Sequence, residues 1–131
     1  MQTPIDPWPA AAGRPAMSGD DLIQRRTCRR FNTDFVEAPP DLIVRLARNA
    51  RPGEWPLNGL RHPPEAETCG WYIWAGETLS SGPDFFEPLP GLLLADLLPS
   101  VVAYLGLPPG WRFLLGPNQE DVWYDPVLLQ T

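Results

Sequence analysis

The chain has 131 residues, of which 44% are hydrophobic, and it carries 18 prolines, 11 glycines and six tryptophans. This length suits one domain with a single core, and no stretch reaches the roughly 18 apolar residues that a membrane helix requires. The formal net charge is −6, and residues 65–131 hold nine acids against one base, Arg112. Such an acidic half repels phosphate backbones, so we expect an acidic, cytoplasmic protein with no nucleic-acid partner and no membrane attachment.

The N-terminal segment divides into an arm and the start of a domain. Residues 1–17 contain four prolines and neither hydrophobic periodicity nor the basic and apolar parts of a secretory signal. We therefore predict a flexible arm over residues 1–17 and a single domain over residues 18–131. Ser18 and Asp21 approximate a capping box, which predicts a helix near residues 19–31.

Two further helical segments are predicted. Pro39 and Pro40 precede apolar residues at a spacing of 3.6, which predicts a helix near residues 40–50. The segment near 91–105 is strongly apolar, and Pro99 interrupts it. Because an internal proline removes a helical hydrogen bond and clashes with the preceding turn, we predict two short helices that meet at a bend.

Residues 54–68, EWPLNGLRHPPEAET, carry the proline and Asn-Gly signals of a loop. His62, the one histidine, lies in this segment, and a hydrogen-bonded anchor is favoured there over a general base. Cys28 and Cys69 lack the spacing of a metal site, and two reduced, half-buried thiols are favoured over a disulfide.

A Gly-Trp motif occurs twice, as GWYIWAG at 70–76 and GWRFLLG at 110–116. Both segments are typical of strands, and a third strand is predicted near 121–125. Matching positions would pair the first tryptophans of the two motifs in a core, although strand aromatics can also form a stacking platform for bases or sugars. The core interpretation is favoured because the strands offer one basic residue; the predicted core residues are Trp71, Ile73, Trp74, Trp111 and Phe113.

These elements predict an α+β fold, in which a small antiparallel sheet packs against short helices on one face. The chemistry-bearing residues are mainly acids, and none has the spacing of a known ligand or catalytic motif. We therefore expect no catalytic residue, metal or cofactor. Solvated loops, a protein-docking surface and a carboxylate catalytic pair remain alternatives for these acids; the docking residues would be Asp84, Glu87, Glu120, Asp121, Trp123 and Tyr124.

Five stretches together resemble the immunity protein 33-like family of bacteria, over about residues 55–129. They are NGLRHPP (58–64), GWYIWAGE (70–77), PDFFEPL (83–89), YLGLPPGWRFLLGP (104–117) and EDVWYDP (120–126). The resemblance implies a place in a polymorphic toxin system, in which an immunity protein binds and blocks a cognate toxin. It implies no catalytic residue, and it leaves residues 1–50 unexplained.

Three functions follow for testing. The first is a non-enzymatic inhibitor that binds a toxin or effector, for instance a basic one, through an acidic face. The second is a small-molecule or glycan-binding domain, or a cryptic enzyme, with Tyr72, Trp74 and the acids lining a cleft. The third is an accessory domain that associates with itself.

Overall fold

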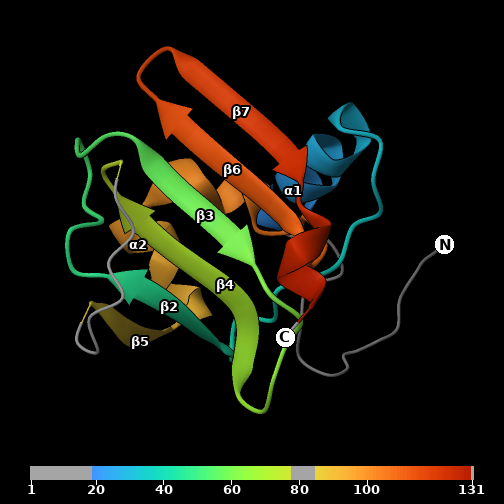
Figure 1. Ribbon diagram of the computed structural model, residues 1–131, viewed down its shortest axis with the longest axis horizontal. Helices are drawn as coiled ribbons and strands as arrows, with labels where there is room; N and C mark the ends of the chain where they lie inside the picture. Colours follow the sequence, from blue (N-terminus) through green and yellow to red (C-terminus); the bar gives the residue numbers. More distant parts are fainter. Residues whose placement is uncertain (1–18, 78–84, 131) are drawn as a thin grey trace, which may run out of the picture.

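The computed structural model describes residues 19–77 and 85–130, so the predicted arm over residues 1–17 lies outside the described residues. The described chain forms one six-stranded sheet with short helices (Figure 1). In chain order the elements are α1 (Gly19–Arg30), β2 (Ile43–Ala47), β3 (Leu57–Arg61), β4 (Thr68–Ala75), β5 (Phe86–Pro90), the 3-10 helix η2 (Gly91–Leu93), α2 (Leu94–Leu97), the 3-10 helix η3 (Pro99–Tyr104), β6 (Trp111–Gly116), β7 (Gln119–Tyr124) and the 3-10 helix η4 (Pro126–Leu129).

The strand order is β5-β2-β4-β3-β6-β7, and all neighbours are antiparallel except β2 and β4, which are parallel. In Figure 1, α1 and the helical segments between β5 and β6 lie behind the sheet, whereas η4 lies at one end of the front face. The α+β class predicted from the sequence is therefore confirmed. Within the two described ranges, no helix is long and apolar enough to cross a membrane.

The main core fills the space between the sheet and the helices. Trp71 and Phe113 are fully buried there, with ring centroids 5.4 Å apart, and the Trp71 indole N–H donates a 3.0 Å hydrogen bond to the carbonyl of Leu105. Trp111 is half-buried, and its ring lies against Tyr124. The expected pairing of Trp71 with Trp111 is wrong, because β3 lies between β4 and β6 and Phe113 reaches across it.

A second, smaller cluster covers the other face of the sheet. Trp74 is 4% exposed and packs with Ala47, Leu60 and Leu128 of η4. Alternation along β4 therefore directs Trp71 and Trp74 to opposite faces, and both faces are covered. Burial of the two faces makes β4 a central strand.

The helix predicted near residues 40–50 is wrong, because residues 43–47 form strand β2. Val44 and Leu46 alternate toward the main core, and β2 pairs with both β4 and β5. The five residues of this segment, IVRLA, are too few for their periodicity to distinguish a helix from a strand. The two neighbouring strands decide the outcome, since they bond every position of this β-branched segment.

The loop predicted for residues 54–68 is also wrong, because Leu57–Arg61 is a central strand with all five residues buried. Gly59 makes this strand possible: the ring of Phe113 occupies the place that a side chain would take, 2.2 Å from a built Cβ. The side chain of Asn58 donates to the carbonyl of Gly76 at 2.7 Å. The Asn-Gly pair therefore serves packing here and not a turn.

Arg61 is a charged residue buried in the interior of the fold, with 1% of the residue exposed. Its guanidinium donates to the carbonyls of Val36, Glu37 and Leu107 at 2.7, 3.0 and 2.8 Å, and its Nε donates to Cys69 at 2.9 Å. Burial lowers the pKa of Arg61, although an arginine remains charged in proteins. The side chain thereby ties β3 and β4 to the segments before β2 and before β6.

Candidate functional site

Strand β7 carries four of the six predicted docking residues and lies at one edge of the sheet. It forms a tight hairpin with β6, in continuous register from Gly116 opposite Gln119 to Trp111 opposite Tyr124. Most of β7 is exposed, including 39% of Trp123 and 48% of Tyr124. Large aromatic residues with this exposure at a sheet edge are candidates for contact with a partner.

The predicted docking residues on β7 divide between its two faces. Glu120 and Tyr124 lie on the helix side, where they contact Tyr104 and Trp111. Asp121 and Trp123 lie on the opposite face, since neighbouring residues of a strand alternate. The structure therefore brings the four residues to one hairpin but not to one flat surface.

Glu120 belongs to a network within the chain. The guanidinium of Arg30 in α1 forms two hydrogen bonds to its carboxylate, at 3.0 and 2.7 Å, and the Tyr104 hydroxyl donates to the same group. The hydrogen bonds from Arg30 hold the pKa of Glu120 below its ordinary value. Burial raises the pKa of Tyr104 to about 12, so the phenol keeps its proton as a donor. This arrangement joins α1, η3 and β7 and partly neutralises the acid.

The other predicted acids lie apart from β7. Glu87 is on β5, at the opposite edge of the sheet, and its carboxylate is 2.6 Å from the guanidinium of Arg48. Five strand spacings separate the two edges, about 24 Å. Asp84 lies outside the described residues.

Sequence reasoning missed the basic partners of these acids. Besides Arg30 and Arg48, Arg112 pairs with Asp125 at 3.1 Å, and its guanidinium lies 5.4 Å from the centre of the Trp123 ring. Ninety positions separate Arg30 from Glu120, so no local pattern could reveal the pair. The acidic half of the sequence is therefore not an unpaired acidic face.

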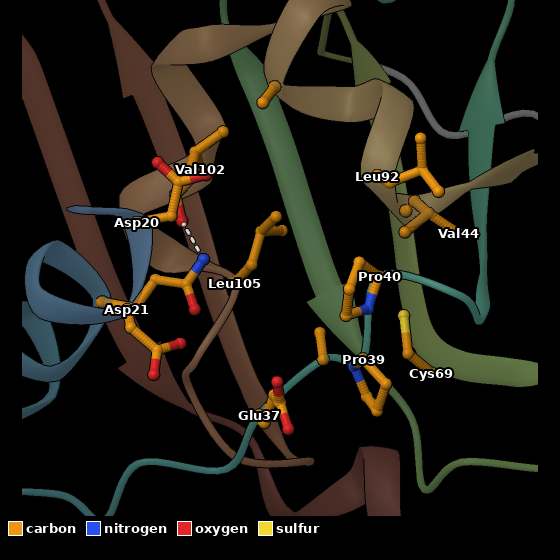
Figure 2. A pocket seen from close by; sticks show the side chains of 14 residues that line it. Asp20, Asp21, Glu37, Pro39, Pro40, Val44, Cys69, Leu92, Val102 and Leu105 are labelled. Carbon is orange, nitrogen blue, oxygen red and sulfur yellow. Dashed lines mark hydrogen bonds between the residues drawn. The ribbon is translucent and has the colours of Figure 1, made fainter. Parts of the chain in front are cut away.

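A pocket of about 240 Å³ lies on the helix side, between α1, the segment before β2, and the helical segments between β5 and β6 (Figure 2). Figure 2 shows Asp20, Asp21 and Glu37 along one side, with Val44 and Leu92 across from them. None of the described residues that line the pocket is basic. Asp21 and Glu37 each already interact with other groups of the chain, so this lining does not by itself select a positively charged ligand.

The thiols offer no reactive group for this pocket. Cys69 lines it, and both Cys69 and Cys28 are buried and free. Burial raises the pKa of each thiol, so both remain protonated and weakly nucleophilic. Both thiols are free, as expected, but they are fully buried, with 1% of each residue exposed, and not half-buried.

His62 lies beside η4 and not among acids. Its Nδ1 is 3.1 Å from the carbonyl oxygen of Leu128, and its ring meets Tyr72 edge to face. These contacts support the anchor interpretation, in which His62 fastens the C-terminal segment to the sheet. Over the described ranges, no three His, Cys, Asp or Glu residues form a group suited to a metal ion.

Together these features define a small α+β domain. Its surface carries the exposed edge strand β7, several acid–arginine ion pairs and one pocket beside α1. The chain belongs to the Imm33-like domain family, which it matches over residues 23–125. The resemblance expected over residues 55–129 is thus confirmed, and the match extends further toward the N-terminus. Most of α1 and all of β2, which the resemblance left unexplained, are parts of the family domain. No curated protein and no solved structure matches the chain significantly.

Proposed function

We propose that this chain is an immunity protein, which binds a cognate bacterial toxin and blocks it without catalysing a reaction. The match to the Imm33-like domain family over residues 23–125 is the observation that carries this proposal. The match covers the whole sheet, most of α1 and the helical segments between β5 and β6, so the proposal concerns the described fold and not an appended segment.

The exposed β7 hairpin supports a binding role. Trp123 and Tyr124 offer large aromatic surfaces on opposite faces of one edge, and Asp121 adds a carboxylate next to them. Aromatic residues with a nearby charge are the usual anchors of protein interfaces. We assign the toxin interface to this hairpin, with Glu120 acting indirectly because Arg30 and Tyr104 already bind its carboxylate.

Net charge supports a basic partner. The chain carries −6 at neutral pH, and an excess of one sign speeds the encounter with an oppositely charged protein. A toxin that acts on nucleic acid would be basic for the same electrostatic reason. The proposal therefore predicts an acidic inhibitor and a basic target.

Co-expression tests this function. The toxin domain encoded beside this gene is induced in bacteria with the full chain, and growth is compared with that of cells carrying the toxin alone. Growth should recover with the wild-type chain and recover less with Trp123→Ala. The matched control is Trp55→Ala, which changes a tryptophan of equal exposure in the segment before β3. Growth arrest despite a full level of folded chain would remove the proposal.

The pocket supports a second candidate function, the binding of a small, mainly apolar molecule. Trp74 is 4% exposed and lines no part of this pocket, so the aromatic cleft expected from the sequence is not the site. Small-molecule sites usually enclose about 300–1,000 Å³, which the pocket of about 240 Å³ does not reach. Trp71, which bonds to the pocket residue Leu105, reports on occupancy. Unchanged tryptophan fluorescence across a panel of small apolar and aromatic molecules would exclude this function.

A further inference from the structure

The two edge strands of the sheet, β5 and β7, differ in how well they can pair with an additional strand. Strand β5 contains Pro88 and Pro90, and proline lacks the N–H that a further strand would need. Strand β7 contains no proline, and its pairing with β6 has no bulge. Natural proteins usually prevent an exposed edge strand from pairing with another chain. The unprotected β7 edge therefore stands out as a place where another strand can bind.

The hydrogen-bond pattern shows which groups of β7 face outward. The Asp125 N–H donates to the carbonyl of Gly110 at 2.6 Å, which fixes the phase of the β6–β7 ladder. Bonded and non-bonded pairs alternate in an antiparallel ladder, so Asp121 and Trp123 bond to β6. Glu120, Val122 and Tyr124 direct their main-chain N–H and C=O groups away from β6. Among the described residues, β7 has β6 as its one partner strand.

Side chains flank this row of outward main-chain groups on both faces. Trp123 lies on one face and Tyr124 on the other, each substantially exposed. An added strand would place its own side chains beside these rings, and cross-strand pairs with aromatic residues stabilise a sheet. The edge thus offers main-chain bonds for affinity and aromatic contacts for selectivity.

We propose that β7 binds an extended, basic strand of the toxin, which becomes the seventh strand of the sheet. This inference rests on the proposed function and specifies how the partner is held. The occupant is a basic strand because the chain carries a net charge of −6, and β7 contains the exposed Asp121 and no basic residue. A second copy of this chain is disfavoured, since two molecules of charge −6 repel each other.

Amide hydrogen exchange of the full chain tests the edge directly. In the free chain, the amides of Glu120, Val122 and Tyr124 should exchange quickly, and those of Asp121 and Trp123 slowly. Addition of the toxin domain encoded by the neighbouring gene should slow the first three. Slow exchange of these amides in the free chain, together with sedimentation as a dimer, would overturn the inference in favour of self-pairing. Unchanged fast exchange in the complex would also overturn it.

A proline variant separates main-chain bonding from side-chain contact. Val122→Pro removes an outward N–H without removing a β6–β7 hydrogen bond, and edge strands tolerate proline at such positions. The matched control is Val122→Ala, which shortens the side chain and keeps the donor. The dissociation constant of Val122→Pro for the toxin domain should exceed that of Val122→Ala by about ten-fold, as expected for one unpaired main-chain group.

The possible results distinguish this inference from the proposed function. Equal affinities of Val122→Pro and Val122→Ala, with tight binding by the wild-type chain, would reject strand addition and leave the immunity function standing. Failure of the wild-type chain to bind the toxin domain would reject both. Thermal unfolding of each variant confirms that the compared chains are folded.

Discussion

Among the described residues, the hydrogen bonds of the buried Arg61 side chain go to main-chain carbonyls and not to a carboxylate. Those carbonyls come from three separate segments, with Val36 and Glu37 in one, Cys69 in the second and Leu107 in the third. A buried polar group that loses its partner costs about 1–3 kcal/mol. The single side chain thus holds together segments that the hydrogen-bond ladder of the sheet does not connect.

We predict that Arg61→Met lowers the free energy of unfolding by at least about 3 kcal/mol, because it leaves several buried carbonyls without donors. Urea denaturation of the full chain measures this change. Arg61→Lys should be nearly as destabilising, since one ammonium group cannot reach carbonyls that diverge around a planar guanidinium. Wild-type stability in the lysine variant would contradict the role assigned to these hydrogen bonds.

The network around Glu120 makes stability depend on pH. The hydrogen bonds from Arg30 depress the pKa of Glu120 below its ordinary value of 4.5. A depressed carboxyl pKa stabilises the fold above the ordinary value, and the contribution disappears as the pH falls through the folded-state pKa. Stability provided by Glu120 is therefore present at neutral pH and lost in acid.

The free energy of unfolding of the wild-type chain should exceed that of Glu120→Gln by a constant amount above about pH 6, and the difference should shrink below about pH 4.5. Chemical denaturation at a series of pH values measures it. Arg30→Gln serves as the matched variant, because it removes the same ion pair from the other side. A difference that is independent of pH would show that the carboxylate charge is not involved.

At the level of single elements, the packing of strand β3 against β6 requires a glycine at position 59. Gly59 lies opposite Phe113 in β6, and a Cβ at Gly59 would lie 2.2 Å from the Phe113 ring. That ring cannot move freely, because it also packs against Trp71 and Tyr104. We predict that Gly59→Ala destabilises the fold by about 1–3 kcal/mol, as overpacking of a core does.

The same Gly59→Ala substitution in a Phe113→Leu variant tests whether the Phe113 ring causes this loss of stability. In Phe113→Leu, the ring atoms that would meet the new methyl group are absent. The further substitution Gly59→Ala should then cost much less, as a double-mutant cycle by urea denaturation would show. Equal costs in the two backgrounds would mean that the Phe113 ring is not what excludes a side chain at position 59.

The same elements show what could be predicted from the sequence. The two Gly-Trp strands and the bend at Pro99 follow from local rules, because glycine, aromatic residues and proline act on their own segments. Strands β2 and β3 do not follow from such rules. Strand β2 pairs with β4 and β5, and β3 pairs with β4 and the distant β6. These pairings override a helical spacing in β2 and an Asn-Gly turn signal in β3.

For the candidate site, too, local features could be predicted from the sequence and non-local pairing could not. Trp123 and Tyr124 are exposed, which their predicted docking role requires. The strand alternation of β7 was available from the sequence, but its position at an edge was not, because strand order depends on non-local pairing. The pairing of Glu120 with Arg30 and of Glu87 with Arg48 was hidden for the same reason.

At the scale of the whole molecule, charge governs the approach of a partner. The net charge of −6 should raise the association rate with a basic toxin at low salt, by roughly ten-fold relative to high salt. Stopped-flow mixing at several ionic strengths measures this rate, and the dissociation rate should change less. An association rate that is independent of salt would remove the electrostatic part of the proposed function.

Direct inhibition of a toxin by binding is the central claim, and titration of purified toxin with the purified full chain tests it most directly. The toxin encoded beside this gene is held at a fixed concentration well above the dissociation constant, and its activity is followed as the chain is added. Toxin activity should fall linearly to a baseline that is reached at one chain per toxin. Full toxin activity in the presence of a several-fold excess of folded chain would contradict it.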